Sequence, residues 1–194
     1  MKVIGLTGGI ATGKSTVSKW LQKRGFQVID ADQIVHELQS IGSPMLASIA
    51  AEFGKSVICA DGSLDRKTLG QIIFNDPNAR HKLEAIMHPA VRAECNEQIA
   101  QSQANVLFLD VPLLFEAGFD DLADVTVVVS ATEQTQLQRL MKRDELSFDQ
   151  AQERIHSQMP IAEKSRRANF VIDNNGNLCE LEENIERFLG EIIN

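Results

Sequence analysis

Residues 8–15 of this chain read GGIATGKS, which matches the pattern G-x-x-x-x-G-K-[ST] of a phosphate-binding loop (P-loop). In such a loop the glycines allow backbone N–H groups to point inward at phosphate oxygens. Lys14 then reaches the β- and γ-phosphates, and the hydroxyl of Ser15 is placed to bind Mg²⁺. The motif constrains the fold strongly, because the loop must leave a strand and open a helix, whose N-terminus stabilises anions.

The flanking sequence supplies the strand and the helix that the loop requires. Residues 2–7 (KVIGLT) form a short apolar run, typical of a buried strand, and residues 14–24 have a helical pattern that closes at Gly25. We therefore expect a nucleoside triphosphate to bind here. The predicted contacts come from the whole loop: Gly9, Ile10, Ala11, Thr12, Gly13, Lys14, Ser15 and Thr16.

Five short runs of the chain are typical of strands. Each is apolar almost throughout instead of alternating, which indicates strands covered by helices on both faces. Helical segments separate the runs, and this pattern predicts right-handed crossovers and a mainly parallel sheet. The fold class predicted is therefore α/β, with a five-stranded parallel sheet flanked by helices. The predicted strands are residues 3–7, 27–29, 106–111, 125–130 and 170–173.

The spacing between the predicted strands is uneven. About seventy residues separate the second strand from the third, too many for one crossover. The stretch is helical in pattern over residues 34–41, 44–53, 66–74 and 77–103. We interpret it as a helical substrate-binding insertion over the carboxyl ends of the strands, where α/β proteins bind ligands. The boundaries predicted are a nucleotide-binding core of residues 1–31, 104–135 and 167–194, the insertion at 32–103, and a lid at 136–166.

The charge of the chain is negative overall and positive locally. The formal net charge is −8, so no overall basic field exists that would favour a nucleic-acid partner. Residues 139–167 nevertheless contain seven basic and five acidic residues. This segment is where a closing lid over a triphosphate is expected, although a solvated helix face would give the same count.

The cysteines and the hydropathy indicate in which cellular compartment the protein is expected. The three cysteines are widely spaced and form no C-x-x-C pair, so neither a zinc site nor a disulfide framework is indicated. No secretory signal and no apolar stretch long enough to span a membrane are found. We expect a soluble, cytoplasmic protein without a membrane partner, either a monomer or a weak homo-oligomer.

Two carboxylates follow the second predicted strand, in the segment VIDAD. Asp32 is positioned to accept a proton from an attacking hydroxyl, as the base does in kinases. The alternative is that Asp32 is the N-cap of a helix starting at Gln33. Asp30 is the weaker candidate for the base.

Residues 106–110 (VLFLD) form a hydrophobic strand that ends in an acid. This is the form of a Walker-B segment, in which Asp110 would hold the Mg²⁺ shell, but strands ending in Asp are frequent. The apolar segment after it, residues 111–116, includes Pro112 and either lines an acceptor pocket or simply packs. His88, before Pro89, is either a substrate contact or a hydrogen-bonded structural residue.

Arg139 and Arg143 are four residues apart and share one face of a predicted helix. Two guanidinium groups there could clamp the charge of a transferring phosphoryl group. The alternative is a surface ion pair with Asp144 or Glu145. The N-K-x-D segment and the D-x-x-G switch of a P-loop GTPase are both missing, and the chain is short for a motor or transporter ATPase. A small-molecule kinase remains, with a nucleotide-dependent binding switch as the non-enzymatic alternative.

Several segments together resemble one family of P-loop kinases. The combination of TGGIATGKST, VIDAD, DGSLDR, the His88–Pro89 pair, DVPLLFEAG, RLMKRD, QMP and ANFVIDNNG is similar to that of dephospho-coenzyme A kinases. The resemblance runs in order over nearly the whole chain. It implies ATP-dependent phosphorylation of the ribose 3′-hydroxyl of dephospho-coenzyme A, the last step of coenzyme A synthesis.

The resemblance also implies roles for individual residues. The P-loop would hold ATP and Mg²⁺, Asp32 would be the base, and Arg139 and Arg143 would be lid arginines. The segment around Asn174 would approach the adenine, and the helical insertion would bind the coenzyme A moiety. Another P-loop kinase, acting on a nucleoside, a nucleotide or a small metabolite, is the alternative.

Overall fold

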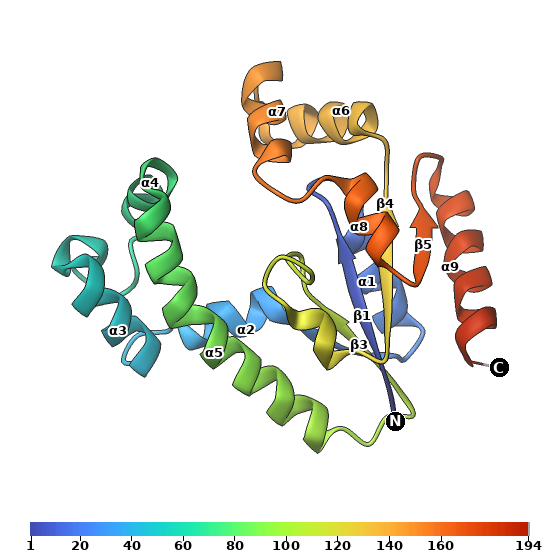
Figure 1. The fold of residues 1–194 in the computed structure, drawn as a ribbon, viewed down its shortest axis with the longest axis horizontal. Coiled ribbons are helices and arrows are strands. Elements are labelled where there is room, and N and C mark those ends of the chain that lie inside the picture. Colours follow the sequence, from blue (N-terminus) through green and yellow to red (C-terminus); the bar gives the residue numbers. More distant parts are fainter. Residues whose placement is uncertain (194) are drawn as a thin grey trace. The chain divides into compact units, whose positions relative to one another are not determined.

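The computed structural model describes residues 1–193. The strands are β1 (Lys2–Gly8), β2 (Gln27–Asp30), β3 (Val106–Asp110), β4 (Val125–Ser130) and β5 (Phe170–Asp173). They form one sheet in the order β2-β3-β1-β4-β5 (Figure 1). The pairings of β1 with β3, of β1 with β4 and of β4 with β5 are all parallel. The predicted α/β class and its five strands are therefore confirmed, with ends that shift by one residue at most.

The central position of β1 decides where the P-loop lies. Leu6 pairs with Asp110 of β3, and Gly8 pairs with Val129 of β4. The loop that leaves Gly8 is therefore flanked by the carboxyl ends of two neighbouring strands. In an open α/β sheet this edge is where ligands bind.

The protein comprises two compact units. The first, the P-loop unit, comprises residues 1–29 and 101–194, and the second, the helical unit, comprises Asp30–Ala100. The helices of the P-loop unit are α1 (Lys14–Lys23), α6 (Glu133–Asp144), α7 (Phe148–His156), α8 (Ile161–Arg167) and α9 (Leu178–Ile193), with a short 3-10 turn, η2 (Phe119–Leu122).

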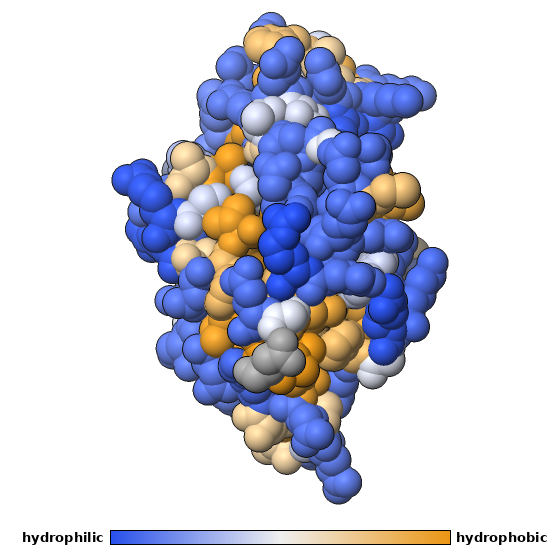
Figure 2. All heavy atoms as spheres, turned by 90° about the vertical axis from the view of Figure 1, so that its right-hand side faces the viewer, coloured by the Kyte–Doolittle hydropathy of each residue, from blue (hydrophilic) through white to orange (hydrophobic). Residues whose placement is uncertain are grey.

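A hydrophobic cluster joins the sheet to α1 and α9. Strand residues such as Ile4, Val127 and Ile172 contribute to it, and they meet Leu21 of α1 and Ile185 of α9. All five are at most 1% exposed. Burial of such side chains is the main stabilising term of the fold, at roughly 25 cal/mol per Å² of apolar surface. Figure 2 shows the right-hand side of the molecule in Figure 1, where hydrophilic side chains cover most of the surface between smaller hydrophobic patches.

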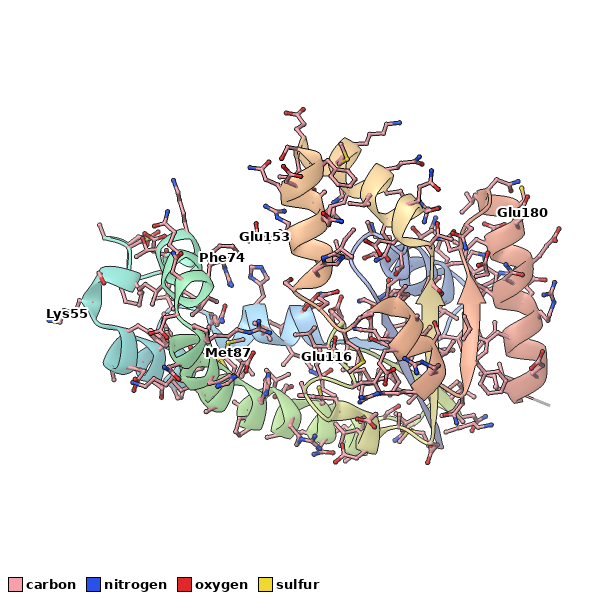
Figure 3. The ribbon with its side chains drawn as sticks, turned by 45° about the horizontal axis from the view of Figure 1, so that its top comes forward. Lys55, Phe74, Met87, Glu116, Glu153 and Glu180 are labelled. Atoms are coloured by element: carbon pink, nitrogen blue, oxygen red, sulfur yellow. The ribbon has the colours of Figure 1, made fainter. Side chains whose placement is uncertain are left out.

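The helical unit consists of α2 (Ala31–Leu38), α3 (Pro44–Phe53), η1 (Lys55–Val57), α4 (Arg66–Asn75) and α5 (Pro77–Gln101). Side chains cap the first three α-helices, because Asp30, Ser43 and Asp65 each accept a hydrogen bond from a backbone N–H of the first turn. The long helix predicted from residue 77 is present and continues through Pro89. Phe74 of α4, labelled in Figure 3, is 70% exposed. No helix among residues 1–193 is long and apolar enough to cross a membrane.

Candidate active site

The backbone of the P-loop curves tightly between β1 and α1. Ala11 and Gly13 have positive φ angles of 59° and 95°, and the amide of Thr12 donates to the carbonyl of Gly9 at 3.2 Å. Gly13 is the N-cap of α1 and supplies no side chain to it. The amide of Thr16 donates to the Gly13 carbonyl at 2.9 Å, which leaves the first-turn amides of Lys14 and Ser15 for another acceptor, and the helix dipole favours an anion at this end.

The glycines of the loop are required by their close neighbours. A Cβ atom on Gly13 would lie 2.1 Å from Nδ2 of Asn174, and one on Gly9 would lie 2.7 Å from Nε2 of Gln136. Any larger residue at these positions would push a buried polar side chain off the loop. The motif is thus fixed by packing as well as by backbone conformation.

Lys14 and Asp110 form an ion pair at the carboxyl ends of the two central strands. The Lys14 side chain is 13% exposed and that of Asp110 only 3%. The structure thus brings the Asp110 carboxylate to the lysine of the P-loop, while its role toward Mg²⁺ stays a prediction. Ser15 and Thr16 follow on the exposed first turn of α1.

The site offers few ligands of its own to a metal ion. Within residues 1–193, no group of three or more His, Cys, Asp or Glu side chains could hold a metal. The donor set is the hydroxyl of Ser15 and the carboxylate of Asp110. Such a set fits Mg²⁺, which keeps several waters and is usually bound by one or two protein oxygens together with substrate phosphates.

Asn174 anchors the P-loop from the far side. Its side-chain Nδ2 donates to the carbonyl of Thr12 at 2.7 Å, and its backbone amide continues the sheet by donating to Ser130 at 2.8 Å. Asn174 is 7% exposed. The family resemblance implied that the segment around Asn174 approaches the adenine. In the structure Asn174 contacts the P-loop itself.

Two glutamines hold the peptide groups of Ile10. The carboxamide of Gln136 on α6 donates to the Ile10 carbonyl at 2.6 Å, and the amide of Ile10 donates to Oε1 of Gln158 at 3.1 Å. Gln136 is 2% exposed. Sequence reasoning did not find either residue. Gln158 lies in the segment QMP, which contributed only to the family resemblance.

A second buried lysine supports the loop. Lys164 of α8 is fully buried, and its Nζ donates to the carbonyls of Gly8 at 3.3 Å and Pro112 at 2.7 Å. Nζ also lies 3.0 Å from a carboxylate oxygen of Glu116, a residue labelled in Figure 3, which accepts the amide of Met159 as well. Burial lowers the pKa of Lys164 below its ordinary value, against the opposite effect of Glu116.

From the sequence, Lys164 was only one of the basic residues of the segment 139–167, with no role of its own. Pro112, a predicted substrate contact, serves this arrangement through its carbonyl, which also accepts from the hydroxyl of Thr7 at 3.0 Å. The last turn of the predicted lid is therefore attached to the P-loop unit.

The two predicted lid arginines differ in their surroundings. Nη1 of Arg139 is buried without a hydrogen-bond partner among residues 1–193, and it lies 3.9 Å from the Cβ position of Gly13. Arg143 instead forms an exposed ion pair with Asp144, which also binds Arg154. The hydrogen bond from Arg143 lowers the pKa of Asp144. Only Arg139 thus lies at the loop, while Arg143 has the surface-pair geometry that the sequence left open.

The start of α2 shows which of the two carboxylates of VIDAD caps the helix. Asp30 is the N-cap of α2, where its carboxylate accepts the amides of Asp32 at 2.9 Å and Gln33 at 3.2 Å. The alternative that Asp32 caps a helix starting at Gln33 is therefore wrong, because α2 begins one residue before Asp32. Asp32 lies on the exposed first turn of α2.

His88 lies in the middle of α5, one residue before the internal Pro89, and is partly buried. A proline inside a helix leaves a carbonyl one turn earlier without its usual partner. The structure thus places His88 within the helical unit.

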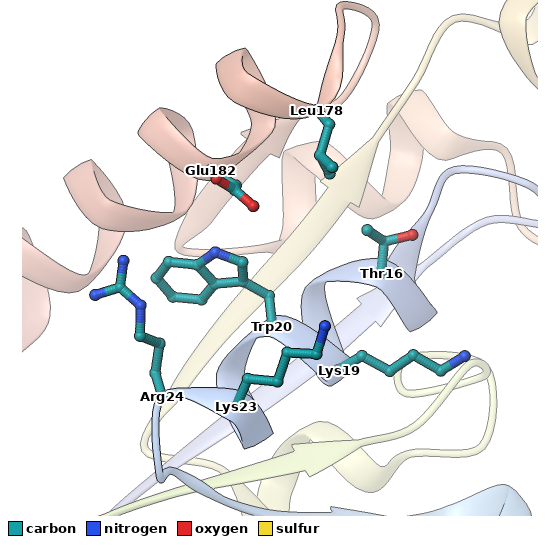
Figure 4. A pocket seen from close by; sticks show the side chains of 7 residues that line it. All are labelled: Thr16, Lys19, Trp20, Lys23, Arg24, Leu178 and Glu182. Carbon is teal, nitrogen blue, oxygen red and sulfur yellow. The ribbon is translucent and has the colours of Figure 1, made fainter.

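A groove of about 460 Å³ runs between α1 and α9 (Figure 4). It begins at Thr16, where the P-loop ends, and its wall includes Leu178 at the start of α9. Trp20 lies along it, with the guanidinium of Arg24 4.4 Å from its ring centroid. Lys19 and Lys23 add positive charge. The groove therefore offers a flat aromatic ring and cations close to the phosphate-binding loop.

Comparison with known proteins assigns the chain to a family. A family profile described as dephospho-CoA kinase matches residues 2–180. A dephospho-CoA kinase of Symbiobacterium thermophilum is 50% identical over 96% of this chain and 79% of its own length. One from Anaeromyxobacter dehalogenans is 47% identical over 99% and 92%.

Solved structures agree with this assignment. A dephospho-CoA kinase from Campylobacter jejuni is similar with a TM-score of 0.74 and 33% identity, over 99% of this chain and 98% of that one. A shikimate kinase from Bacteroides thetaiotaomicron, at 17% identity, shares the fold with a TM-score of 0.58 over 100% and 99% of the two chains. The chain belongs to the dephospho-CoA kinase family.

Proposed function

We propose that this chain transfers the γ-phosphoryl group of ATP to the ribose 3′-hydroxyl of dephospho-coenzyme A. The observation that carries the proposal is the family match over residues 2–180, which coincides with a complete P-loop. In the reaction the 3′-oxygen forms a bond to the γ-phosphorus, the bond from that phosphorus to the bridging oxygen breaks, and ADP leaves. The hydroxyl proton passes to the carboxylate of Asp32.

The triphosphate is assigned to the P-loop. The amides of Lys14 and Ser15 at the start of α1 and the ammonium of Lys14 supply donors and positive charge. The buried Nη1 of Arg139 beside Gly13 has a hydrogen bond left to give, and a phosphate oxygen would satisfy it. Ser15 and Asp110 would hold Mg²⁺, which neutralises charge on the phosphates when bound.

The alternative activity, that of another P-loop kinase, differs from the proposed one in its acceptor, so the acceptor is what the first experiment tests. Incubating the enzyme with ATP, Mg²⁺ and one acceptor at a time should release ADP rapidly with dephospho-coenzyme A. Adenosine, cytidine monophosphate and shikimate should give at most a slow background. Turnover of one of these three, with none for dephospho-coenzyme A, would assign the chain to another P-loop kinase activity. Slow hydrolysis that is independent of the acceptor would indicate a nucleotide switch.

The nucleoside of ATP is assigned to the groove between α1 and α9, since this groove opens where the P-loop ends. Trp20 is the only tryptophan of the chain, so its fluorescence reports on this groove alone. ATP should change the intensity or emission maximum of Trp20, whereas inorganic tripolyphosphate, which has no base, should change it much less. Equal responses to both compounds would place the base elsewhere.

A further inference from the structure

We propose that Arg66 and His36 form a diphosphate-binding subsite in the helical unit, which holds the diphosphate bridge of the acceptor. This inference deepens the proposed function and rests on it. Dephospho-coenzyme A is an adenosine 5′-diphosphate joined to a pantetheine arm. The acceptor therefore brings one charged diphosphate close to the ribose that carries the reacting hydroxyl.

A pocket of about 510 Å³ lies in the helical unit between α2 and the start of α4. Its polar lining includes His36 of α2, Gln39 at the C-cap of that helix, Ser63 of the turn before α4 and Arg66 of α4. Ile41, which is 64% exposed, lies on the same pocket. The pocket thus combines an anion-binding side with an apolar side.

Arg66 is held in place without losing its charge to a carboxylate. Its guanidinium donates to Oε1 of Gln39, and its Nη2 lies 3.0 Å from Nδ1 of His36. None of the ion pairs within residues 1–193 includes Arg66. The adjacent Asp65 is occupied, because its carboxylate accepts the amide of Thr68 at 2.9 Å and its hydroxyl at 2.7 Å.

The contact between Arg66 and His36 fixes the tautomer of the imidazole. A guanidinium only donates, so Nδ1 of His36 must accept, and the ring proton then lies on Nε2. The pair presents the remaining N–H groups of Arg66 and the Nε2–H of His36 as donors. A planar guanidinium beside a second donor is well suited to a phosphate group.

The spacing along α2 connects this subsite to the proposed base. Asp32 and His36 are four residues apart on α2, so they share a face, with Cβ atoms about 5–6 Å apart. In an adenosine 5′-diphosphate the 3′-hydroxyl and the C5′ arm that carries the diphosphate leave neighbouring ribose carbons, C3′ and C4′, so the hydroxyl and the diphosphate lie within a similar distance of each other. An acceptor whose hydroxyl meets Asp32 can therefore place its diphosphate at His36 and Arg66, with the arm directed along Ile41.

The test replaces Arg66 and compares it with its neighbour. Arg66→Gln should raise KM for dephospho-coenzyme A roughly tenfold to a hundredfold, the usual range for a lost charge-assisted hydrogen bond. KM for ATP, kcat and the melting temperature should stay near their original values. Lys67→Gln is the matched control, because it removes the same charge from the next position of α4 and does not line the pocket.

Two further variants keep the test decisive. Arg66→Lys keeps a charge without the planar fork and should recover part of the affinity. His36→Phe keeps the ring and removes both nitrogens, so it should raise the same KM even if Arg66→Gln fails to fold.

Equal KM values for the Arg66→Gln and Lys67→Gln enzymes would overturn the subsite. So would a parallel rise in KM for ATP, which would point to a structural role. If the unmodified enzyme itself does not turn over dephospho-coenzyme A, the proposed function fails, and this result is distinct from either of the others.

Discussion

We expect the replacement of Asp32 with Asn to lower kcat by about 10²–10⁴, the usual size of a general-base contribution, while ATP still binds. The amide is nearly the same size as the carboxylate but cannot take the proton of the 3′-hydroxyl. The capping of α2 is expected to survive, because Asp30 and not Asp32 accepts the first-turn amides. The loss should therefore appear in steady-state kinetics with dephospho-coenzyme A, without a fall in the melting temperature.

Asp30→Asn is the matched control for this prediction. Asn is as good an N-cap as Asp, so the variant removes a carboxylate two residues away and keeps the helix start. We expect its kcat to remain close to that of the unmodified enzyme. If instead Asp32→Asn turns over normally, or Asp30→Asn carries the loss, Asp32 is not the base.

The sequence was sufficient for the sheet because local signals determined it. The strands are continuous apolar runs, and the P-loop motif itself marks the end of β1 and the start of α1. The length of the interval between β2 and β3 likewise predicted helices there, which the structure contains. Each of these signals depends on neighbouring residues and not on the tertiary fold.

The support of the P-loop could not be predicted in the same way. Lys164 is 156 residues from Gly8 in the chain, and Gln136 is 126 residues from Ile10. No pattern of spacing distinguishes the buried Lys164 from the exposed basic residues of the same segment.

The positions of the two lid arginines could likewise not be predicted from their spacing in the sequence. Arg139 and Arg143 share a helix face by their spacing, yet only Arg139 lies at the loop. Its guanidinium is close to Gly13, whereas the next turn extends to the surface and to Asp144. The segment VIDAD shows the same dependence on the backbone, because the sequence offered Asp32 as the helix cap and the structure has Asp30 in that role. The backbone of α2 was needed to choose between them.

Lys14→Met should lower kcat by about 10²–10³, the usual cost of removing one preorganised donor to a developing charge. It should also destabilise the protein by about 3–5 kcal/mol, because the carboxylate of Asp110, buried at 3% exposure, loses its ion pair with Lys14. Thermal unfolding and steady-state kinetics measure the two effects. Adding Asp110→Asn to this variant removes the buried negative charge, so it should recover much of the stability and none of the transfer.

Lys164→Met is the matched comparison, since it removes the other lysine that pairs with a carboxylate beside the loop. Its partner Glu116 is 22% exposed and can be solvated, so the loss of stability should be smaller than for Lys14→Met. Because Lys164 acts through the carbonyls of Gly8 and Pro112, its loss should raise KM for ATP more than it lowers kcat. If Lys164→Met lowers kcat more than Lys14→Met does, then Lys164, and not Lys14, stabilises the transferring phosphoryl group.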